Sequence, residues 1–502
     1  MTRSGEPGER RMSRAELLRR GAALAAGAGA LGAVTPSLAA SKPPLGDLAR
    51  AAQGPLLRPG SGAYAAARRV VNARYDGARP LAVLKARGVP DVRAAVSWSV
   101  RNGVRFAARS GGHSYAGYST LNGGLVVDLS ALNGIAVSAD RRTVQVGAGA
   151  RLIDVYTALA RRGLTIPAGS CPTVGMGGLA LGGGVGLASR ALGTTCDNVV
   201  ALTVVTADGR ALACDARRNA DLFWACRGGG GGNFGIATGF TLTTHRVGSA
   251  SYFFASFPWS RAAEVILAWQ RWAPVAPDDL FSICSLSTGS SGPTVSAFGQ
   301  WMGDQAGLRR ALRGLTTAVA PSSLTVGTSS YLDLMLRWAG CLGDSPAECR
   351  RPPSDLFAAA SSYARRPLTA AGARAIVSAV ERRQAQSAAG SGAILLDSYG
   401  GAINRVAPDA TAFVHRDSLF SLQFLAYWGS SAGAAPGVAW LRGARRAVRP
   451  FVSRFSYQNY IDPDLPNWPT AYYGANLDRL QDIKARRDPD DVFRFRQSIP
   501  LP

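Results

Sequence analysis

The first half of the chain alternates short apolar runs with amphipathic segments, a pattern typical of mixed strands and helices. The segments GLVVDLS at 124–130 and TVQVGAGA at 143–150 predict strands, and the second alternates apolar and polar positions. Residues 151–163 place apolar side chains at helical spacing and end at a glycine. A hairpin is predicted over 199–212, because Asp208-Gly209 supplies a turn with positive φ.

The segment before residue 103 predicts two strands followed by a helix. Its apolar pieces VVNARY at 70–75 and LAVLKA at 81–86 favour strands. DVRAAVSWSVRNG then has helical spacing, and Asn102-Gly103 provides the stop signal.

From residue 251 the pattern changes to longer helical segments and to strands richer in aromatic side chains. RAAEVILAWQRWA and TAAGARAIVSAVERRQAQ predict helices, and LFSLQFLAYW predicts a strand. After residue 454 an aromatic loop, YQNYIDPDLPNW, precedes the helical NLDRLQDIKARR, and no tandem repeat is present. We therefore expect a second α+β unit after the first.

Composition places the chain among folded proteins with more than one core. It has 502 residues, of which 47% are hydrophobic and 18% charged, so it is too apolar for a disordered chain and too long for one minimal domain. The formal net charge is +24, which suggests acidic partners without establishing them. A nucleic-acid binder would rest on this charge alone, since no Lys/Arg motif is interleaved with aromatic residues. We expect no nucleic-acid partner.

Residues 1–40 are expected to be an export signal. Several arginines precede a mild apolar run from Gly21 to Val34, and Ser37-Leu38-Ala39 has the small-x-small form of a cleavage site. The segment 13–19 resembles a twin-arginine signal but departs from the strict motif at Ala15. The twin-arginine and ordinary secretory routes therefore both stay open. The apolar run is too short for a membrane span, so we expect a secreted protein without a membrane anchor after processing.

Cysteine and histidine usage argues against a metal site. The chain has seven cysteines and three histidines, and no CxxC pair occurs. Cys341 and Cys349 bracket a short loop, and in an exported protein they can close a disulfide. Two free thiols are the alternative, and the sequence does not decide between them.

Three glycine-dense loops are the strongest sign of chemistry. They are RSGGHSYAG at 109–117, AGSCPTVGMGGLALGGGVG at 168–186 and RGGGGGNFGIATGF at 227–240. Residues without a Cβ let backbone N–H groups turn toward one point and let a ligand approach closely, which suits a pyrophosphate. None of the loops has the GxGxxG spacing of a dinucleotide fingerprint. They therefore predict a cofactor cradle of another type.

Each of the first two loops contains a candidate nucleophile. His113 lies in the first and Cys171 in the second. An imidazole nitrogen and a thiolate are the readiest nucleophiles of a protein, so both can attack a bound electrophilic ring. The alternatives are a neutral turn histidine and a small buried cysteine.

These loops and the C-terminal segment resemble those of the berberine bridge enzyme-like flavin oxidases, members of the vanillyl-alcohol-oxidase superfamily with a p-cresol-methylhydroxylase-type FAD domain. RSGGHSYAGYS is similar to the loop whose histidine attaches to the flavin 8α-carbon, and AGSCPTVGMGG to the loop whose cysteine attaches to C6. The segment from YQNY onward is similar to the C-terminal module of that family. The resemblance implies an α+β fold with a two-part FAD-binding domain at 44–250, a substrate domain with an antiparallel sheet at 251–453, and a module at 454–502 that returns to the FAD domain.

The resemblance also implies FAD held covalently by His113 and Cys171. Backbone groups of the first two loops are expected to receive the pyrophosphate, and the third loop is expected to close over the cofactor. Val174 matches the position where valine accompanies oxidases and leucine accompanies dehydrogenases. The expected cofactor-binding residues are His113, Cys171, Ser110, Gly111, Gly112, Val174, Gly177, Gly178, Asn233, Gly235 and Ile236.

The implied activity is that of an oxidase, which takes a hydride from an alcohol or sugar carbon and passes the electrons to oxygen, giving hydrogen peroxide. A base must then lie within hydrogen-bond reach of the substrate hydroxyl. Tyr460 is the candidate base, and a phenol needs help to act as a base near neutral pH. Either positive potential from the basic chain favours its ionised form, or Asp397 accepts a proton or orients the tyrosine pair; the sequence does not decide between these. The expected site-lining residues are Tyr460, Tyr457, Asp397, Gln423 and Tyr115.

A sugar is the first expected substrate, and a secondary-metabolite alcohol of polyketide or alkaloid type is the second. Glutamine at position 423 disfavours an alkaloid-type ring closure, because an amide cannot abstract a proton.

A hydrolase is the alternative from another class. GHSYAG at 112–117 resembles the GHSxxG elbow of α/β hydrolases, with Ser114 as nucleophile and His245 or His415 as base. Such an elbow needs a helix directly after the serine, whereas YSTLNGGLVVDLS predicts a turn and a strand. The sequence therefore disfavours this alternative.

Overall fold

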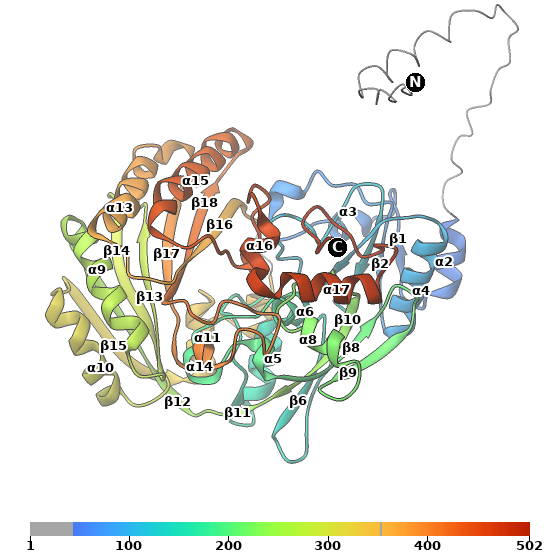
Figure 1. Ribbon diagram of the computed structural model, residues 1–502, viewed down its shortest axis with the longest axis horizontal. Coiled ribbons are helices and arrows are strands. Elements are labelled where there is room, and N and C mark those ends of the chain that lie inside the picture. Colours follow the sequence, from blue (N-terminus) through green and yellow to red (C-terminus); the bar gives the residue numbers. More distant parts are fainter. Residues whose placement is uncertain (1–43, 352–353) are drawn as a thin grey trace, which may run out of the picture. The chain divides into compact units, whose positions relative to one another are not determined.

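The computed structural model describes residues 44–351 and 354–502 (Figure 1). Its first part contains a four-stranded sheet in the order β1-β2-β4-β3, a five-stranded sheet in the order β5-β6-β10-β8-β9, and a pair of β11 and β7. The strands are β1 Leu56–Leu57, β2 Ala82–Lys85, β3 Phe106–Arg109, β4 Leu125–Asp128, β5 Ile135–Val137, β6 Thr143–Gly147, β7 Leu164–Thr165, β8 Val199–Val205, β9 Ala211–Asp215, β10 Ile236–Thr243 and β11 His245–Arg246.

The two larger sheets share one hydrophobic core. β2 and β3 both pair with β4 in parallel, and helix α4 makes the crossover between them, burying Trp98. β8 and β9 form the predicted hairpin, whose turn uses a φ of 75° at Gly209. The predicted strands β4 and β6 and the predicted helix α5 are confirmed. The helices of this part are α2 Leu45–Ala51, α3 Tyr64–Ala67, α4 Val89–Arg101, α5 Leu152–Ala160, α6 Met176–Leu181, α7 Ser189–Leu192 and α8 Ala220–Ala225.

The strand predicted at 70–75 is wrong, because its second half forms a turn of 3-10 helix. Asn72 accounts for the difference. Its side chain accepts the Arg74 N–H at 3.2 Å, and its Nδ2 donates to the Phe357 carbonyl at 3.0 Å. An asparagine that satisfies nearby backbone groups competes with a strand ladder.

The second half of the chain contains a seven-stranded antiparallel sheet in the order β15-β12-β14-β13-β17-β18-β16. Helices α9, α10, α13 and α15 cover one face (Figure 1), and residues such as Cys284, Leu396 and Phe424 point into the core beneath them. The predicted α+β fold with an antiparallel sheet in its second unit is confirmed. The elements are β12 Ser249–Phe257, α9 Ala262–Trp272, β13 Leu280–Ser287, β14 Thr294–Trp301, α10 Gln305–Ala318, β15 Ser323–Ser330, α11 Tyr331–Trp338, α12 Pro346–Cys349, β16 Leu356–Ala364, α13 Ala370–Gln384, β17 Gly392–Ser398, α14 Gly401–Arg405, β18 Phe420–Trp428 and α15 Ala434–Val448.

The opposite face of this sheet carries polar and aromatic side chains. One row crosses four strands, with Ile283, Asp397, Ser421 and Tyr363 as successive register partners. Gln423 lies two residues beyond Ser421 on β18 and therefore shares this face. The sheet thus presents a carboxyl and an amide on the side that the four helices leave uncovered.

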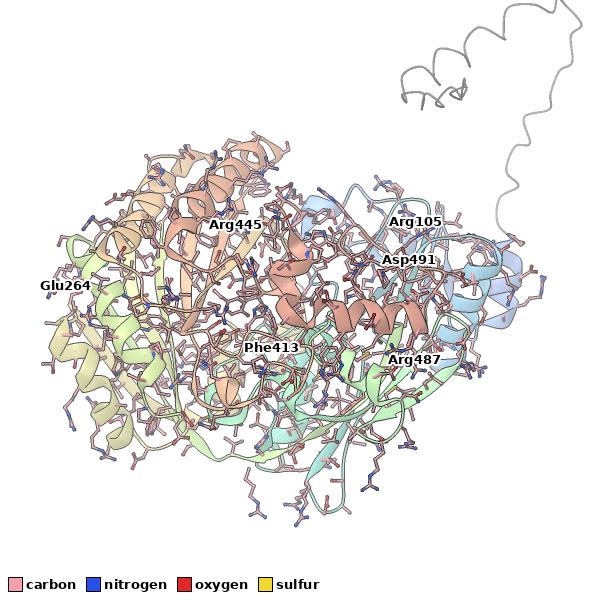
Figure 2. All side chains as sticks on the ribbon, in the orientation of Figure 1. Arg105, Glu264, Phe413, Arg445, Arg487 and Asp491 are labelled. Carbon is pink, nitrogen blue, oxygen red and sulfur yellow. A yellow bond between two sulfur atoms is a disulfide. The ribbon has the colours of Figure 1, made fainter. Side chains whose placement is uncertain are left out.

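The chain from residue 454 returns to the first part of the molecule. Leu480 of α17 belongs to the core of the first two sheets. Lys484, also in α17, is fully buried and donates to the Asn233 carbonyl at 3.0 Å. At the surface, Arg487, labelled in Figure 2, pairs with Asp221 of α8 at 2.7 Å. The helices of this segment are α16 Trp468–Tyr473 and α17 Leu477–Arg487.

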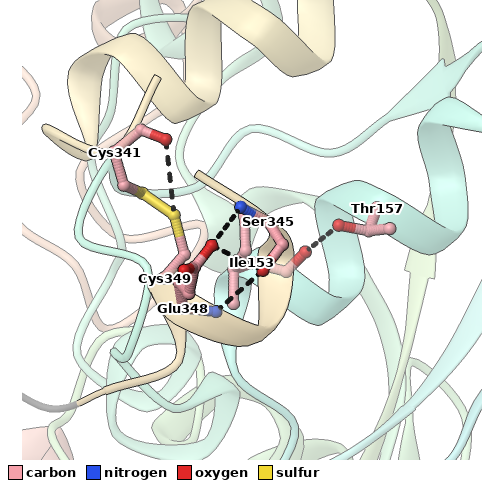
Figure 3. Close-up of a disulfide and its surroundings, with 6 residues drawn as sticks. All are labelled: Ile153, Thr157, Cys341, Ser345, Glu348 and Cys349. Atoms are coloured by element: carbon pink, nitrogen blue, oxygen red, sulfur yellow. Dashed lines mark hydrogen bonds between the residues drawn. A yellow bond between two sulfur atoms is a disulfide. The ribbon is translucent and has the colours of Figure 1, made fainter. Parts of the chain in front are cut away.

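Cys341 and Cys349 form a disulfide (Figure 3), which decides the question that the sequence left open. The bridge closes a loop after α11, and Ile153 of α5 packs beside both cysteines. Arg350, next to the bridge, pairs with Asp154 of α5 at 2.5 Å. The loop that the disulfide closes therefore packs against α5, the helix that precedes the second glycine loop.

Candidate cofactor and active site

The first two glycine loops contact each other through their backbones. A Cβ on Gly111 would lie 2.3 Å from the Gly175 nitrogen, and a Cβ on Gly175 would lie 2.0 Å from Ser110 Oγ. Ser110 Oγ in turn donates to the Ala148 carbonyl at 2.5 Å. Only glycine permits so close an approach, so the two loops form one continuous surface.

This surface presents backbone N–H groups that can receive a ligand. Those of Gly111, Gly112 and Gly178 have no acceptor in the part of the chain that the structure describes. A Cβ on Gly178 would meet nothing within 4 Å. Gly177 differs, because its N–H donates to the Ala148 carbonyl at 2.9 Å and is not available for the predicted phosphate contact. Unpaired backbone amides on a glycine-lined surface fit the phosphates of a dinucleotide.

His113 is held by the second loop. Its Nε2 lies 2.9 Å from Oγ1 of Thr173, which is buried. Desolvation, and next the charge of Arg151, lower the pKa of His113 to about 4, while the Thr173 backbone opposes the shift. The ring is therefore uncharged at neutral pH, and an uncharged imidazole has the lone pair that a nucleophile needs.

Cys171 is accessible to solvent yet has protein atoms on most sides. Its side chain is exposed, while desolvation raises the pKa of its thiol. Its ionised form would raise the pKa of both Tyr115 and Tyr427, so these side chains lie near the sulfur. The thiol form dominates at neutral pH, and attack by this sulfur requires loss of its proton. Val174 lies beside it, with its N–H donating to the Cys171 carbonyl at 3.3 Å.

The third loop is fixed by contacts within the protein. Asn233 Oδ1 accepts the Ile499 N–H at 2.9 Å, which ties the loop to the C-terminal segment. Gly235 has a φ of 157°, and a Cβ there would lie 2.4 Å from the Val204 side chain. Ile236 is buried at the start of β10. Contact of these loop residues with a cofactor stays a prediction.

Side chains from the polar face of the seven-stranded sheet meet the first loop. Gln423 Nε2 donates to the Tyr115 hydroxyl at 2.9 Å. The Tyr115 ring stacks on Tyr460 with 5.6 Å between centroids, and it meets Phe357 edge-on at 5.2 Å. The structure therefore brings Tyr115, Gln423 and Tyr460 together at one point.

Tyr457 and Tyr460 have different surroundings. The Tyr457 hydroxyl accepts hydrogen bonds from the Gly184 N–H at 2.7 Å and from Asn459 Nδ2 at 3.1 Å. The Tyr460 hydroxyl makes no hydrogen bond with another described residue. The two rings meet edge-on at 5.0 Å. Tyr457 is thus anchored to the second glycine loop, whereas Tyr460 offers an unpaired phenol.

Asp397 is a buried carboxyl near these phenols. Its Oδ2 accepts the Ser421 hydroxyl at 3.1 Å, and desolvation raises its pKa to about 6. Desolvation, and next the charge of Asp397, raise the pKa of Tyr460 well above its ordinary value. The raised pKa of Tyr460 argues against the alternative in which the basic chain ionises this phenol, because burial and an acidic neighbour outweigh distant positive charge. Asp397 is the group of the two that is ionised at neutral pH.

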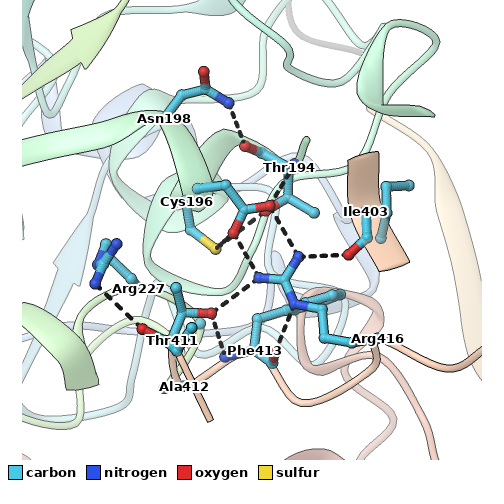
Figure 4. A network of polar contacts seen from close by, with 12 residues as sticks. Thr194, Cys196, Asn198, Arg227, Ile403, Thr411, Ala412, Phe413 and Arg416 are labelled. Carbon is cyan, nitrogen blue, oxygen red and sulfur yellow. Dashed lines mark hydrogen bonds and ion pairs between the residues drawn. The ribbon is translucent and has the colours of Figure 1, made fainter. Parts of the chain in front are cut away.

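A buried ion pair supports the wall behind Tyr457. Arg416, labelled in Figure 4, makes two hydrogen bonds to Asp197, at 2.9 and 2.5 Å. It also donates to the Phe413 carbonyl at 3.1 Å and to the Ile403 carbonyl at 3.1 Å. The Phe413 ring meets Tyr457 edge-on at 5.9 Å. This bidentate pair therefore holds the aromatic side chain against which Tyr457 packs.

Three residues that line the site were not predicted from the sequence: Thr173, Phe357 and Tyr427. Nothing in the loop sequence marks the contact of Thr173 with His113, since that contact is made only in the fold. Phe357 and Tyr427 are register partners whose ring centroids lie 5.6 Å apart. The period-two alternation of LFSLQFLAYW places Tyr427 on the same face as Gln423, so a signal for this residue is present in the sequence.

The hydrolase alternative is wrong. The segment after Ser114 continues through turns into β4, without a helix. Ser114 Oγ accepts the Tyr118 N–H at 3.1 Å, while His245 Nε2 lies 2.7 Å from Asn198 Oδ1. His415 is buried and stacked on another aromatic ring. Within the described chain, neither histidine makes a hydrogen bond to Ser114.

Residues 44–351 and 354–502 contain neither a metal-binding cluster nor a helix that could span a membrane. No group of three or more His, Cys, Asp and Glu side chains there is arranged to hold a metal ion. No helix there has the length and apolar character needed to cross a bilayer. The predicted export signal at 1–40 lies outside these residues.

Comparisons with known proteins cover nearly the whole described chain. Residues 80–215 match the family described as FAD binding domain, and residues 456–500 match the one described as berberine and berberine like. The chain is 36% identical to the uncharacterized FAD-linked oxidoreductase YgaK of Bacillus subtilis, over 82% of this chain and 89% of the relative. It is 31% identical to the chitooligosaccharide oxidase of Gibberella zeae, over 84% of this chain and 87% of the relative. The structure of BBE-like 1 from Physcomitrella patens has a TM-score of 0.84 at 32% identity, over 91% of this chain and 99% of that one.

The two matching regions contain the first two glycine loops and the two tyrosines, whereas the third glycine loop, Asp397 and Gln423 lie outside them. The first includes the loops of His113 and Cys171, and the second includes Tyr457 and Tyr460. The unpaired amides and the uncharged imidazole fit FAD, the cofactor in the name of the Bacillus subtilis relative and in the description of the first matching family. The chain therefore belongs to the berberine bridge enzyme-like family of FAD-linked oxidoreductases.

Proposed function

We propose that this protein is an oxidase that transfers a hydride from the hydroxyl-bearing carbon of a sugar or another alcohol to a flavin bound covalently to His113 and Cys171. The observation that carries the proposal is the meeting of the polar sheet face with the two loops that bear the nucleophiles. Gln423 bonds to Tyr115, which belongs to the loop of His113 and lies near Cys171. A carboxylate, a phenol and two candidate tethers thus share one site.

The first two glycine loops hold the cofactor in this proposal. The amides of Gly111, Gly112 and Gly178 would receive the pyrophosphate, and His113 and Cys171 would fix the ring. FAD, when bound, supplies the acceptor for the substrate hydride. Two tethers prevent loss of the cofactor outside the cell, which agrees with export directed by residues 1–40, a second part of the proposal.

Asp397 and Tyr460 take up the proton that the substrate hydroxyl loses. A hydride leaves the substrate carbon only as the adjoining hydroxyl loses its proton, so an acceptor must lie within reach. Tyr460 has the unpaired hydroxyl and contacts the substrate, while Asp397, ionised above a pKa of about 6, accepts the proton from this phenol. Gln423 and Tyr115 orient the substrate by hydrogen bonds.

Oxygen is the proposed electron acceptor, and hydrogen peroxide is the product. Val174 occupies the position where valine accompanies oxidases in the family, next to the Cys171 carbonyl. The reduced protein is therefore expected to regain its yellow colour in air. A reduced protein that stays bleached in air yet recolours with a dye would identify a dehydrogenase instead.

A sugar is the first proposed substrate class. The relative from Gibberella zeae is named for an oligosaccharide, and Gln423 and Tyr115 supply the donors and acceptors that sugar hydroxyls need. A hydrophobic secondary-metabolite alcohol is the second class. Phe357 and Tyr427 favour it, because their rings line the same sheet face as Gln423.

A peroxide assay across both classes tests the proposal. The purified protein is given oligosaccharides or hydrophobic alcohols in air, and hydrogen peroxide is measured; bleaching of the flavin absorbance is followed without oxygen. Turnover of sugars alone or of hydrophobic alcohols alone assigns the class. A flavin that no member of either class bleaches would exclude the proposed reaction.

A further inference from the structure

Thr173 contacts the His113 loop at two points. Its Oγ1 lies 2.9 Å from His113 Nε2. Its carbonyl oxygen lies so close to Gly111 that a Cβ there would be 2.7 Å away. Thr173 is 1% exposed, and a β-branched side chain has few rotamers, so its hydroxyl has a fixed position. Of the two ring nitrogens of His113, only Nε2 has a partner in the described chain.

We infer that Thr173 is a positioning residue for covalent flavin attachment, because it accepts a hydrogen bond from Nε2–H of His113 and leaves Nδ1 as the attacking nitrogen. This inference rests on the proposed function, in which His113 is a tether. The two nitrogens of a neutral imidazole are not equivalent: the one that carries the proton has no lone pair in the ring plane and cannot attack. The bond to Thr173 therefore decides which nitrogen is the nucleophile.

The electrostatic surroundings agree with this assignment. Desolvation and the charge of Arg151 keep the ring neutral by lowering the pKa to about 4, so a single N–H remains. The Thr173 backbone acts in the opposite sense, as an acceptor near a ring N–H does. The hydroxyl and the backbone of Thr173 therefore both lie within hydrogen-bond reach of the imidazole.

The attachment step balances with oxygen as the oxidant that the proposed function already includes. A bond forms between Nδ1 and the flavin 8α-carbon, and one C–H bond of that methyl group breaks. The electron pair of the C–H bond stays in the flavin until oxygen accepts it. One proton comes from the methyl carbon, the other leaves Nε2 by way of the Thr173 hydroxyl, and both end in hydrogen peroxide. Thr173 therefore serves first as hydrogen-bond acceptor and then in the release of the proton.

Peptide mass spectrometry of Thr173 variants tests the inference. After digestion with trypsin, His113 and Cys171 lie on different peptides, so flavin on each is measured separately in one sample. Thr173→Val keeps the shape but removes the acceptor, and attachment to His113 is expected to be roughly tenfold slower or more. Thr173→Ser keeps the hydroxyl and is expected to restore attachment. The link at Cys171 serves as the internal control and is expected to stay.

Each of the following results either supports or overturns the inference about Thr173. Parent-like flavin on the His113 peptide of Thr173→Val would overturn the inference. Loss of both links together with a lower melting temperature would overturn it too, since Thr173 would then only support the fold. A parent protein with no flavin on either peptide would instead refute the covalent part of the proposed function, whatever the variants do. Loss at His113 alone, restored by serine, is the result expected.

Discussion

Phenylalanine substitutions of two tyrosines three residues apart are predicted to have different effects. Tyr460→Phe is expected to slow flavin reduction roughly 100-fold or more with little change in the free energy of unfolding, because its hydroxyl bonds to no described residue. Tyr457→Phe is expected to lower that free energy by about 1–3 kcal/mol, because it strands the buried Gly184 N–H. Rapid-mixing reduction without oxygen and urea unfolding measure the two effects. Parent-like reduction in Tyr460→Phe would refute its role as the phenol in contact with substrate.

The pH dependence of flavin reduction is predicted from Asp397. The rate is expected to rise with pH through about 6, as the carboxyl loses its proton. Ser421 donates to the ionised carboxyl and lowers its pKa, so Ser421→Ala is expected to move the midpoint to higher pH. Asp397→Asn should remove the step from the profile. A midpoint that Ser421→Ala leaves unchanged would show that another group controls the rate.

The same carboxyl predicts a stability change of definite sign. Desolvation raises the pKa of Asp397 from 3.8 to about 6, so the folded chain binds this proton more tightly than the unfolded chain. The stabilisation is complete below the unfolded pKa and is lost as pH rises through the folded one. Asp397→Asn should therefore unfold at the same denaturant concentration as the parent in acid, but at a higher one at pH 8. A gain of at most about 3 kcal/mol is expected there.

At the scale of whole loops, two glycines provide a matched pair of substitutions. A Cβ on Gly111 would press against the backbone of the second loop at 2.3 Å, whereas a Cβ on Gly178 would meet nothing within 4 Å. Gly111→Ala should therefore lower the melting temperature and the flavin content together. Gly178→Ala should keep or raise the melting temperature, since alanine favours a helix, yet lower the flavin content. Unchanged flavin in Gly178→Ala would show that the cofactor does not pass over this residue.

Elements with a strong local pattern could be predicted from the sequence. The hairpin of β8 and β9, the helices α5 and α17 and the strand β18 follow from periodicity and turn residues alone. The strand expected at 70–75 fails because Asn72 pairs with Phe357, far away in the chain. A local sequence pattern carries no information about a hydrogen-bond partner so far away in the chain.

The features of the candidate site can likewise be divided into those that the sequence predicts and those that depend on the fold. Glycine density marks the loops of His113 and Cys171, and the spacing in YQNY marks Tyr457 and Tyr460. The hydrogen bond from the Gly177 N–H to the Ala148 carbonyl makes this amide unavailable to a cofactor. Both this bond and the raised pKa of Tyr460 depend on packing between distant segments. Motifs therefore located the chemistry, while burial determined which groups can carry it out.

At the scale of the molecule, the site lies where two hydrophobic cores approach each other. One core belongs to the glycine-loop sheets and the C-terminal helices, and the other lies under the helices of the seven-stranded sheet. Arg190 of α7 links them. It is buried and donates to the carbonyls of Leu280 at 2.7 Å, Pro274 at 3.0 Å and Ala276 at 2.5 Å, and to that of Tyr399. One guanidinium from the first part thus satisfies four backbone acceptors of the second.

Replacing Arg190 should weaken the coupling of the two cores. Arg190→Met fills similar space but leaves buried carbonyls without a donor, and each costs about 1–3 kcal/mol. We expect the parent to unfold in a single calorimetric transition, and we expect Arg190→Met to unfold at lower temperature in two transitions, because each core keeps its own apolar contacts. Arg210→Met is the control, since Arg210 is an exposed residue whose ion pair with Asp208 at 2.5 Å is worth little. If Arg190→Met unfolds in one transition at the parent temperature, the cores are held together by their other contacts, and the position of Asp397 opposite the glycine loops does not depend on this arginine.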